Sequence, residues 1–448
     1  MDKGVDIENL RVIEFLGILN IVMNSEISIK NPSKLQTRFL TGLGLLLLLL
    51  APVPVRAQHV ILISCDGTRP DAITAFGQAH TPTFRRLRTE GAYTDNARTE
   101  VAHTTTLQNH TSMITGLPVG GPGGHGWTDN SNPKLGVNLH RNRNAYLPSV
   151  FDVAHDHGLK TALLASKTKF SLYDLSYDAQ RGAADKIGPD NGKDKIDVCL
   201  VSGATVSLVD RLVEELKSSN PPHFSMLHLS NPDAAGHESG WKLESKNSDY
   251  MKSIAMVDSL IGRVMETIDT SDQLRGRTHV IVTADHGGLA GTIGHEEPTK
   301  RDNFRVPLYV WGPGVKSGAE LYSLNRSSRR DPADENPAKG VPPIRNGEVG
   351  NLALRILGLP PIPGSVHNAG HDLAFSDRYM ELTGTQASDS AGSNPATTDP
   401  GRNTFASRNA AAADASPAIR AVPTGVEADR PESPRARVFR AIPVERAP

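Results

Sequence analysis

Between His59 and about Leu373, short apolar runs alternate along the chain with segments in which apolar residues recur at a helical period. The runs are continuous, and most end in charged or hydroxyl residues: HVILISCDG, KTALLAS, HFSMLHLSNPD, THVIVTADHGG and VPLYVWGPG. Continuous runs of this length are typical of strands that are buried on both faces. We therefore predict a sheet with helices on both of its sides.

Helical segments separate these strands. DYMKSIAMVDSLIGRVMETI repeats apolar residues at a spacing that puts them on one face of a helix. TPTFRRLRTEGA, PSVFDVAHDHG and GEVGNLALRILGL are predicted as further helices, the first opened by Thr81-Pro82 and the last stopped by Gly358. The alternation predicts an α/β fold, a three-layer α/β/α sandwich around a mainly parallel central sheet.

The amino-terminal segment has a different pattern. Two basic residues precede an apolar run from Leu40 to Leu50, and a small-x-Ala cleavage signal follows it. This layout is typical of a secretory signal peptide. We assign residues 1–57 to an N-terminal extension with a signal peptide. We expect export to the periplasm or the medium, with no stable membrane span after cleavage. The alternatives to a signal peptide are a buried helix or a retained anchor, and translation could instead begin at Met23.

The rest of the chain divides into one domain and a tail. Residues 58–376 are predicted to form the α/β domain, with a substrate-shaping insert around residues 171–195 that matches no motif. Residues 387–448 are rich in Ala, Ser, Pro, Thr and Arg and have few large apolar side chains. Such a composition cannot offset the entropy of ordering, so this tail is predicted to be disordered.

The charge balance narrows the choice of partners. The 448 residues include 48 basic and 49 acidic side chains, for a formal net charge of -1. Nucleic-acid-binding proteins show clustered positive charge, so we expect no specific recognition of nucleic acid. The oligomeric state is left open.

Acidic and histidine residues gather where predicted strands end, which is the edge at which open α/β sheets bind ligands. In NPDAAGHESG, two of them stand four residues apart, at a predicted strand end and the turn after it. Six oxygen and nitrogen donors without cysteine suit one or two divalent ions, zinc first, with manganese or iron as alternatives. The donors are Asp66, Asp233, His237, Asp285, His286 and His295.

Five motifs resemble those of the alkaline phosphatase superfamily, most closely its type I phosphodiesterase and nucleotide pyrophosphatase branch. They are ILISCDGTRPD, TTTLQNHTSMITG, NPDAAGHESG, TADHGG and VPLYVWGPGV. The resemblance implies a site for two zinc ions at the carboxyl edge of a parallel sheet. It assigns Asp66, Thr106, Asp285 and His286 to one ion, and Asp233, His237 and a later histidine to the other.

The resemblance leaves that later histidine open. His295 follows the Asp-His pair closely and precedes NFRVPLYVWGPG, as in the shorter members of the superfamily, and we favour it. In the nucleotide pyrophosphatases proper the histidine lies further along the chain, which would select His367 or His371.

The resemblance also selects a nucleophile. The family has its threonine three residues before an Asn-His pair, which identifies Thr106, and leaves Thr104 and Thr105 as backbone-capping residues. Metal coordination activates such a hydroxyl, and a helix amino terminus favours both an alkoxide and a phosphate. Asn109 is expected to donate to a phosphate oxygen. The expected reaction is in-line attack on phosphorus, which gives a phospho-threonine that water then hydrolyses.

The expected substrate is a small phosphate ester or phosphonate, and the sequence does not specify which group is attached to its phosphorus. Asn109 is the one donor we can assign, which favours a phosphodiester or a nucleotide pyrophosphate over a phosphomonoester. Lys167 and Lys169 resemble a lysine pair that holds the substrate carboxylate in phosphonoacetate hydrolases, so C–P hydrolysis is an alternative. A sulfatase is disfavoured, because the C-x-P-x-R motif is missing. The alternative outside enzymes is an exported, metal-stabilised surface binding protein.

Overall fold

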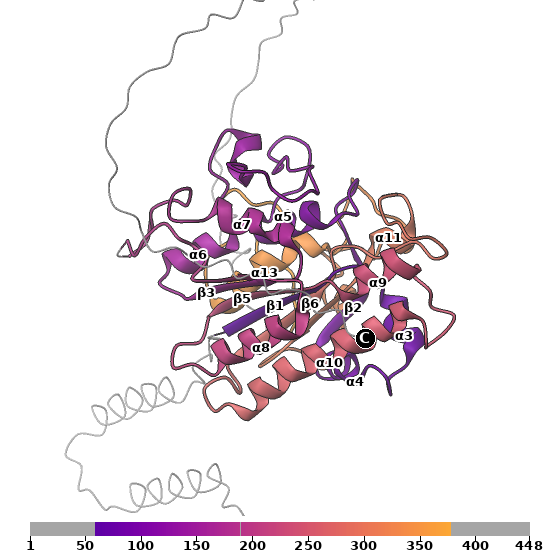
Figure 1. Cartoon of the computed structure of the whole chain (residues 1–448). Helices are drawn as coiled ribbons and strands as arrows, with labels where there is room; N and C mark the ends of the chain where they lie inside the picture. The colour runs from indigo at the N-terminus through magenta and orange to yellow at the C-terminus, as the bar shows by residue number, and fades with distance from the viewer. Residues whose placement is uncertain (1–58, 189, 378–448) are drawn as a thin grey trace, which may run out of the picture. The chain divides into compact units, whose positions relative to one another are not determined.

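A computed structural model describes residues 59–188 and 190–377 of the chain (Figure 1). The predicted extension and signal peptide of residues 1–57 and the predicted tail of residues 387–448 lie outside the described residues. In the part that is described, no helix has both the length and the apolar content needed to cross a bilayer.

One eight-stranded sheet forms the centre of the described part, in the order β4-β3-β5-β1-β6-β7-β2-β8. The first five strands in this order are parallel, whereas β7 is antiparallel to both of its neighbours. The strands are β1 (His59–Cys65), β2 (Ala92–Arg98), β3 (Thr161–Ala165), β4 (Val198–Val201), β5 (Phe224–Leu229), β6 (Thr278–Thr283), β7 (Arg305–Trp311) and β8 (Ala319–Glu320). The predicted α/β fold with a mainly parallel sheet is confirmed.

Helices cover both faces of this sheet (Figure 1). On one face lie α5 (Thr106–Thr115), α6 (Val150–Asp156), α7 (Ser171–Ser176) and α13 (Val349–Leu357). On the other lie α4 (Pro82–Glu90), α8 (Thr205–Leu216) and α10 (Asp249–Thr270). The shorter helices α3 (Pro70–Phe76), α9 (Asn231–Ser239) and α11 (Arg301–Phe304) occupy connections between strands, and α12 (Leu321–Leu324) follows β8.

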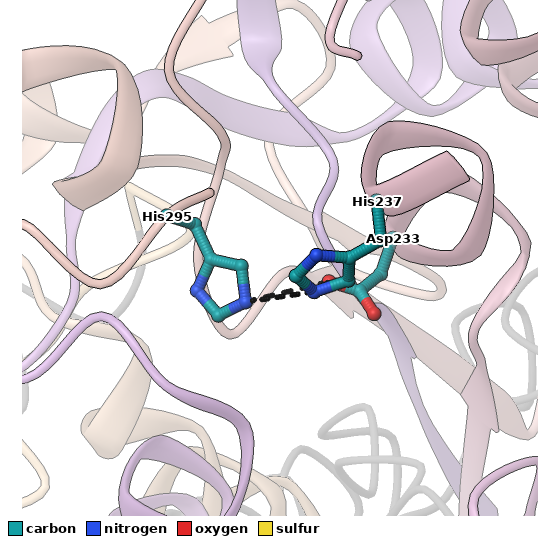
Figure 2. A group of neighbouring side chains, drawn as sticks. All are labelled: Asp233, His237 and His295. Atoms are coloured by element: carbon teal, nitrogen blue, oxygen red, sulfur yellow. Dashed lines mark hydrogen bonds and ion pairs between the residues drawn. The ribbon is translucent and has the colours of Figure 1, made fainter. Parts of the chain in front are cut away.

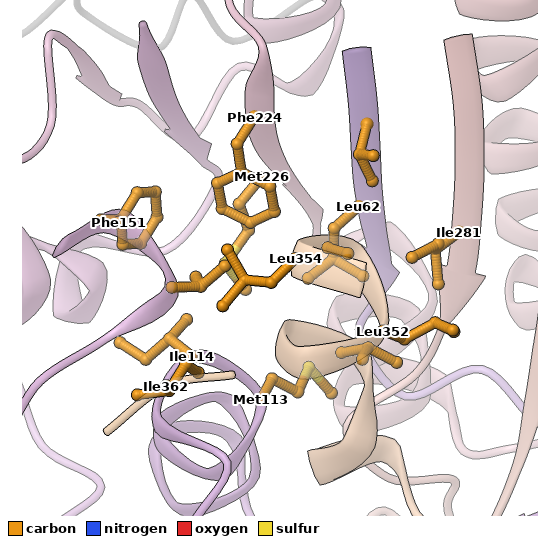
Figure 3. Packing of buried hydrophobic residues seen from close by; sticks show 14 of the residues in the cluster. Leu62, Met113, Ile114, Phe151, Phe224, Met226, Ile281, Leu352, Leu354 and Ile362 are labelled. Carbon is orange, nitrogen blue, oxygen red and sulfur yellow. The ribbon is translucent and has the colours of Figure 1, made fainter. Parts of the chain in front are cut away.

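The central strand β1 contributes to both hydrophobic layers. Side chains alternate along a strand, so Val60 and Leu62 pack into one core and Ile61 and Ile63 into the other. Figure 3 shows Leu62 among side chains of the first core, which come from α5, α13 and the neighbouring strands. Burying each such side chain stabilises the fold by about 1.5–3 kcal/mol. These two cores fix the strand ends from which the site is built.

Candidate metal centre

Two groups of potential metal ligands lie at the carboxyl ends of the central strands. Within each group, one donor atom per residue lies within 4.8 Å of the others. All the side chains are buried except that of His237, which is 43% exposed. The structure thus brings together all six donors that the sequence singles out. The first group is Asp66, Asp285 and His286, and the second is Asp233, His237 and His295.

The first group is held by the pairing of β1 with β6. Asp66 follows β1 directly, and Asp285 follows β6 after one residue, so their parallel pairing brings the two carboxylates together. The backbone N–H of Gly67 donates to Asp285 Oδ1 (3.2 Å). His286 bonds the carbonyl of Gly287 through Nδ1 (2.8 Å), while its Nε2 lies 3.3 Å from an oxygen of each carboxylate.

The second group is built on a helix, and the prediction of a strand end followed by a turn is wrong here. Strand β5 ends at Leu229, and α9 begins at Asn231 with Pro232 in its first turn. Proline is favoured there because its fixed φ suits a helix start. Asp233 and His237 therefore lie one helical turn apart on the same face, with Nε2 of His237 3.4 Å from Asp233 Oδ1.

His295 completes this group from a loop far along the chain (Figure 2). Its Nδ1 bonds the carbonyl of Thr104 (2.6 Å), and Nδ1 of His237 bonds the carbonyl of Ile293 (2.8 Å). Both rings consequently direct Nε2 to the same point, where the two nitrogens are 3.2 Å apart. A metal-ligating histidine usually has this arrangement. One ring nitrogen bonds a backbone carbonyl, and the other points to the metal ligands.

The alternative third ligands lie elsewhere. Nε2 of His367, which is partly exposed, is 2.8 Å from Oε1 of the buried Glu100. His371 has a left-handed backbone (φ 52°) in the loop that precedes the last described residues. Neither histidine belongs to either of these two groups.

Several donor atoms of the cluster have no hydrogen-bond partner among the described residues. Buried polar atoms without a partner are rare, because each costs free energy. Four of them face one another here, and all four are oxygen or imidazole nitrogen atoms that suit divalent zinc, manganese or iron. The residues present therefore fit a metal centre. The atoms are Asp66 Oδ1, Asp233 Oδ1, Asp285 Oδ2 and His286 Nε2.

The charges in the cluster shift its pKa values in opposite directions. Burial would raise the pKa of Asp66, but the Lys167 ammonium and the hydrogen bond from His228 hold it well below its usual range. Burial and the charge of Asp66 raise the pKa of Asp285 well above its usual value. Burial also lowers the pKa of His295 to about 4, so its ring is neutral at pH 7, as a metal ligand must be.

Thr106 is the first residue of α5 and is buried, with its hydroxyl beside the cluster. Its Oγ accepts a hydrogen bond from Nζ of Lys167 (3.3 Å). Thr104 and Thr105 are predicted to cap the backbone, but neither hydroxyl caps the start of α5. The hydroxyl of Thr105 donates to Oε1 of Gln108, and that of Thr104 donates to the carbonyl of His295.

The amide group of Asn109 is engaged within its own segment. Nδ2 donates to the carbonyls of His103 (2.9 Å) and Thr105 (3.1 Å). Oδ1 accepts from the backbone N–H of Glu100 (2.9 Å), which fixes the orientation of the amide. Both amide hydrogens are thus already used, and the structure gives no support to the prediction that Asn109 donates to phosphate.

The two lysines of the predicted pair, Lys167 and Lys169, have different surroundings. Nζ of Lys167 lies 2.6 Å from Asp66 Oδ2 and 2.7 Å from Asp233 Oδ2, so it bridges the two ligand groups. The side chain of Lys169 is half-buried and makes no hydrogen bond or ion pair with any described residue. Burial and the charge of Lys167 lower the pKa of Lys169.

One polar residue of the site was missed from the sequence. His228 lies in the buried strand β5, donates through Nε2 to Asp66 Oδ2 (2.9 Å) and contacts Ser166 through Nδ1 (3.0 Å). A titratable residue within an otherwise apolar strand was the available signal, since such a residue needs a buried partner.

These features define an α/β protein with two adjoining groups of potential metal ligands and a buried threonine at the carboxyl edge of its sheet. Residues 60–302, more than half of the chain, match the sequence profile of the family described as "Type I phosphodiesterase / nucleotide pyrophosphatase", and the chain belongs to this family.

The individual relatives that the chain matches have low sequence identity to it. Ectonucleotide pyrophosphatase/phosphodiesterase family member 1 of Mus musculus is 26% identical over 249 residues, which cover 54% of this chain and 25% of the relative. The Homo sapiens protein is 26% identical over 255 residues, covering 54% and 24%. The chain therefore spans about a quarter of the length of these curated relatives. Among solved structures, murine ectonucleotide pyrophosphatase/phosphodiesterase 5 superposes with a TM-score of 0.47 at 16% identity, over 71% of this chain and 100% of that one.

Proposed function

We propose that this protein is an exported, metal-dependent phosphoric ester hydrolase that cleaves phosphodiester or nucleotide pyrophosphate bonds through a phospho-threonine intermediate. The observation that carries the proposal is a set of contacts around one ammonium group. Nζ of Lys167 touches Thr106 Oγ and one carboxylate from each ligand group, so the hydroxyl and both groups surround the same point.

The ligand groups are proposed to hold two divalent ions, zinc first, with manganese or iron as alternatives. Such ions, when bound, make a hydroxyl or a water more acidic and neutralise the charge that develops on phosphate oxygens. One ion would be held by Asp66, Thr106, Asp285 and His286, and the other by Asp233, His237 and His295.

Thr106 is the proposed nucleophile. Its oxygen forms a bond to phosphorus while the bond from phosphorus to the leaving oxygen breaks, and that oxygen departs as an alcohol or a phosphate. Water then displaces Thr106 and restores its hydroxyl. Because Thr106 is the first residue of α5, the backbone N–H groups of that helix start favour the negative charge at each stage.

Asn109 has a positioning role in this proposal. Its amide joins the backbone of Glu100, His103 and Thr105, and so holds the turn that leads into Thr106. The buried side chain of His228 supports Asp66 in the same way from β5. Such supporting contacts keep reacting groups in register without touching the substrate.

A second candidate function is the hydrolysis of a phosphonate such as phosphonoacetate. Lys169 favours it, because this half-buried ammonium near the site forms no close ion pair with a described carboxylate and is available for a second negative group on a substrate. The same charge would serve the terminal phosphate of a nucleotide, so Lys169 is a proposed substrate-binding residue for both classes. Lys167 already pairs with Asp66 and Asp233, so it is not available for this second group.

The test combines metal analysis with three substrates. The exported full-length protein is purified, its metal content is measured by elemental analysis, and turnover of bis-(p-nitrophenyl) phosphate, p-nitrophenyl phosphate and phosphonoacetate is compared. The proposal expects about two metal ions per chain and preference for the diester. Faster turnover of phosphonoacetate would establish the second candidate. Bound metal without turnover of any of the three would instead indicate a metal-stabilised binding protein.

A further inference from the structure

Trp241 is the largest fully buried side chain among the described residues, and it packs against the second ligand group. The residue stands two positions after the end of α9, where Gly240, with a positive φ of 86°, turns the chain back toward the helix. The centroid of the indole lies 5.3 Å from that of the His237 ring and 5.9 Å from that of the His295 ring. Both contacts are edge-on, at interplanar angles of 75° and 72°. Two of the three donors of this group therefore contact one indole.

Two glycines make room for this indole. Gly236 lies on α9, one residue before His237, and Gly288 lies two residues after His286, a donor of the first group. A Cβ at either glycine would overlap atoms of the indole. Neither glycine has a positive φ, so the indole, and not the backbone conformation, requires glycine at both positions. The ring is thus held between a segment of the second ligand group and a segment of the first.

The indole is also joined to the end of β1. Its Nε1 donates to the carbonyl oxygen of Gly67 at 3.2 Å, and the backbone N–H of the same glycine donates to Asp285 Oδ1. The rings of His295 and His286 are stacked, with centroids 3.6 Å apart. Trp241 is therefore linked to the first group twice, through the backbone of Gly67 and through this stack of rings. A displaced indole would change how the two groups face each other.

We infer that Trp241 is a positioning residue of the metal centre, which holds the second ligand group against the first without contacting an ion or the substrate. Contacts that orient ligating imidazoles contribute strongly to metal affinity. Loss of the indole would free the rings of His237 and His295 to turn, whereas the first group is fixed by the pairing of β1 with β6. The inference rests on the two-ion centre of the proposed function. The ion of the second group thus depends on Trp241 more than the ion of the first group does.

The test measures zinc binding to the wild type, to Trp241→Leu and to Trp241→Phe. Calorimetric titration of the metal-free proteins gives the number of ions and the Kd of each, and urea unfolding without metal shows whether the variants are folded. Trp311→Phe is the matched control. Its indole also donates one hydrogen bond, to Glu90 Oε2 (2.9 Å), but Trp311 pairs with Val280, toward the end of β6 that is away from Asp285.

Trp241→Leu is expected to bind the ion of the first group as the wild type does, and to bind the other about 10–100-fold more weakly. The weakened ion should be the one that is lost from His295→Ala. Trp241→Phe keeps an aromatic ring but loses the bond to Gly67, so it should recover part of the affinity. Trp311→Phe should match the wild type. Equal weakening of both ions, or weakening of neither, in Trp241→Leu would overturn the inference.

Gly236→Ala tests the same contact from the helix. Alanine is favoured over glycine inside a helix, so this substitution would stabilise α9 if the indole were not there. In the presence of the indole, it should weaken the ion of the second group. In Trp241→Leu, which leaves space for the added methyl group, it should weaken that ion no further. Losses that simply add in the double variant would contradict the inference.

The chain has three tryptophans, which permits a spectroscopic test on an unaltered centre. In the double variant Trp127→Phe/Trp311→Phe, all indole emission comes from Trp241. The emission should change as zinc binds to the second group, because two donors of that group contact the ring. Emission that responds to neither ion would refute the inference.

These readouts do not depend on turnover, so they separate the inference from the proposed function. If the wild type binds two zinc ions but hydrolyses no phosphate ester, the proposed function fails, and selective weakening of one ion in Trp241→Leu would still support the inference. A wild type that binds no second ion would overturn the inference, even if it hydrolyses an ester.

Discussion

The backbone N–H of Asp233 donates to the carbonyl oxygen of Asp66 at 3.1 Å, so the two ligand groups are joined through the main chain. Gly67 makes this approach possible. It has a left-handed backbone (φ 70°), and a Cβ at this position would lie 2.8 Å from the Cα of Asp233. The close approach of the two groups therefore requires glycine at position 67, because any side chain there would push them apart.

Gly67→Ala is expected to push α9 away from β1 and to separate Asp233 from Asp66. We expect metal affinity to fall by about tenfold or more, and the free energy of unfolding to fall by about 1–3 kcal/mol from backbone strain. Metal titration by calorimetry and urea unfolding measure the two effects.

Gly77→Ala is the matched control, because Gly77 also has a positive φ (85°) but has no atom within 4 Å of the added Cβ. It should show the strain cost alone, with unchanged metal affinity. If both variants bound metal as the wild type does, the close approach of Asp233 to Gly67 would have no role in the site.

Thr106→Ala is expected to abolish turnover, by roughly 10⁴-fold or more, since it removes the oxygen that would bond to phosphorus. All six side-chain donors of the two groups come from other elements than α5, so metal should be retained. Rapid acid quenching followed by mass spectrometry should detect a phosphorylated Thr106 in the wild type. Thr105→Ala removes a hydroxyl that bonds Gln108 and should retain activity. Full activity in Thr106→Ala would exclude a phospho-threonine at this position.

The sequence predicts the parts of the fold in which burial and pattern agree. All five continuous apolar runs are strands, because a strand buried on both faces has no polar position to interrupt it. The strands that were missed, β2, β4 and β8, lie toward the sheet edges. In β2, the segment AYTDNAR has polar and partly exposed positions, so its pattern does not distinguish it from a loop.

The site was predictable in composition and less so in geometry. Asp66 and Asp285 could be assigned to strand ends, because each directly follows an apolar run. The helix that carries Asp233 could not be inferred, since NPDAAGHES has too few apolar residues to show a period. The position of Lys167 depends on contacts with three other segments, which local pattern does not encode.

His295→Ala and His367→Gln are expected to differ in metal content. Nε2 of His295 lies 3.2 Å from that of His237 and 3.7 Å from Asp233 Oδ1, whereas His367 pairs with Glu100. We expect His295→Ala to bind about one metal ion fewer per chain than the wild type, because three donors are the usual minimum for a catalytic zinc site. His367→Gln should keep its full complement. The reverse result, measured by elemental analysis, would transfer the ligand role to His367.

The Glu100–His367 pair should make stability depend on pH. Burial would raise the pKa of Glu100, but the charges of His367 and Arg345 outweigh it and lower this pKa to about 2. A carboxyl with a lowered folded-state pKa contributes stability above its unfolded value of 4.5, and this contribution is lost as the pH falls from 4.5 toward 2. The fall in pKa corresponds to roughly 3 kcal/mol.

His367→Gln removes the first of these charges, so the pKa of Glu100 should rise toward 4.5, and the stability lost between pH 4.5 and 2 should be smaller than in the wild type. Urea unfolding at pH 7, 5, 4 and 3 measures the shift. Lys300→Gln is the control, because Lys300 and Glu297 form an exposed pair 3.8 Å apart, which contributes little. It should unfold as the wild type does at each pH. An unchanged acid limb in His367→Gln would mean that Arg345 and the remaining surroundings hold the Glu100 carboxylate without His367.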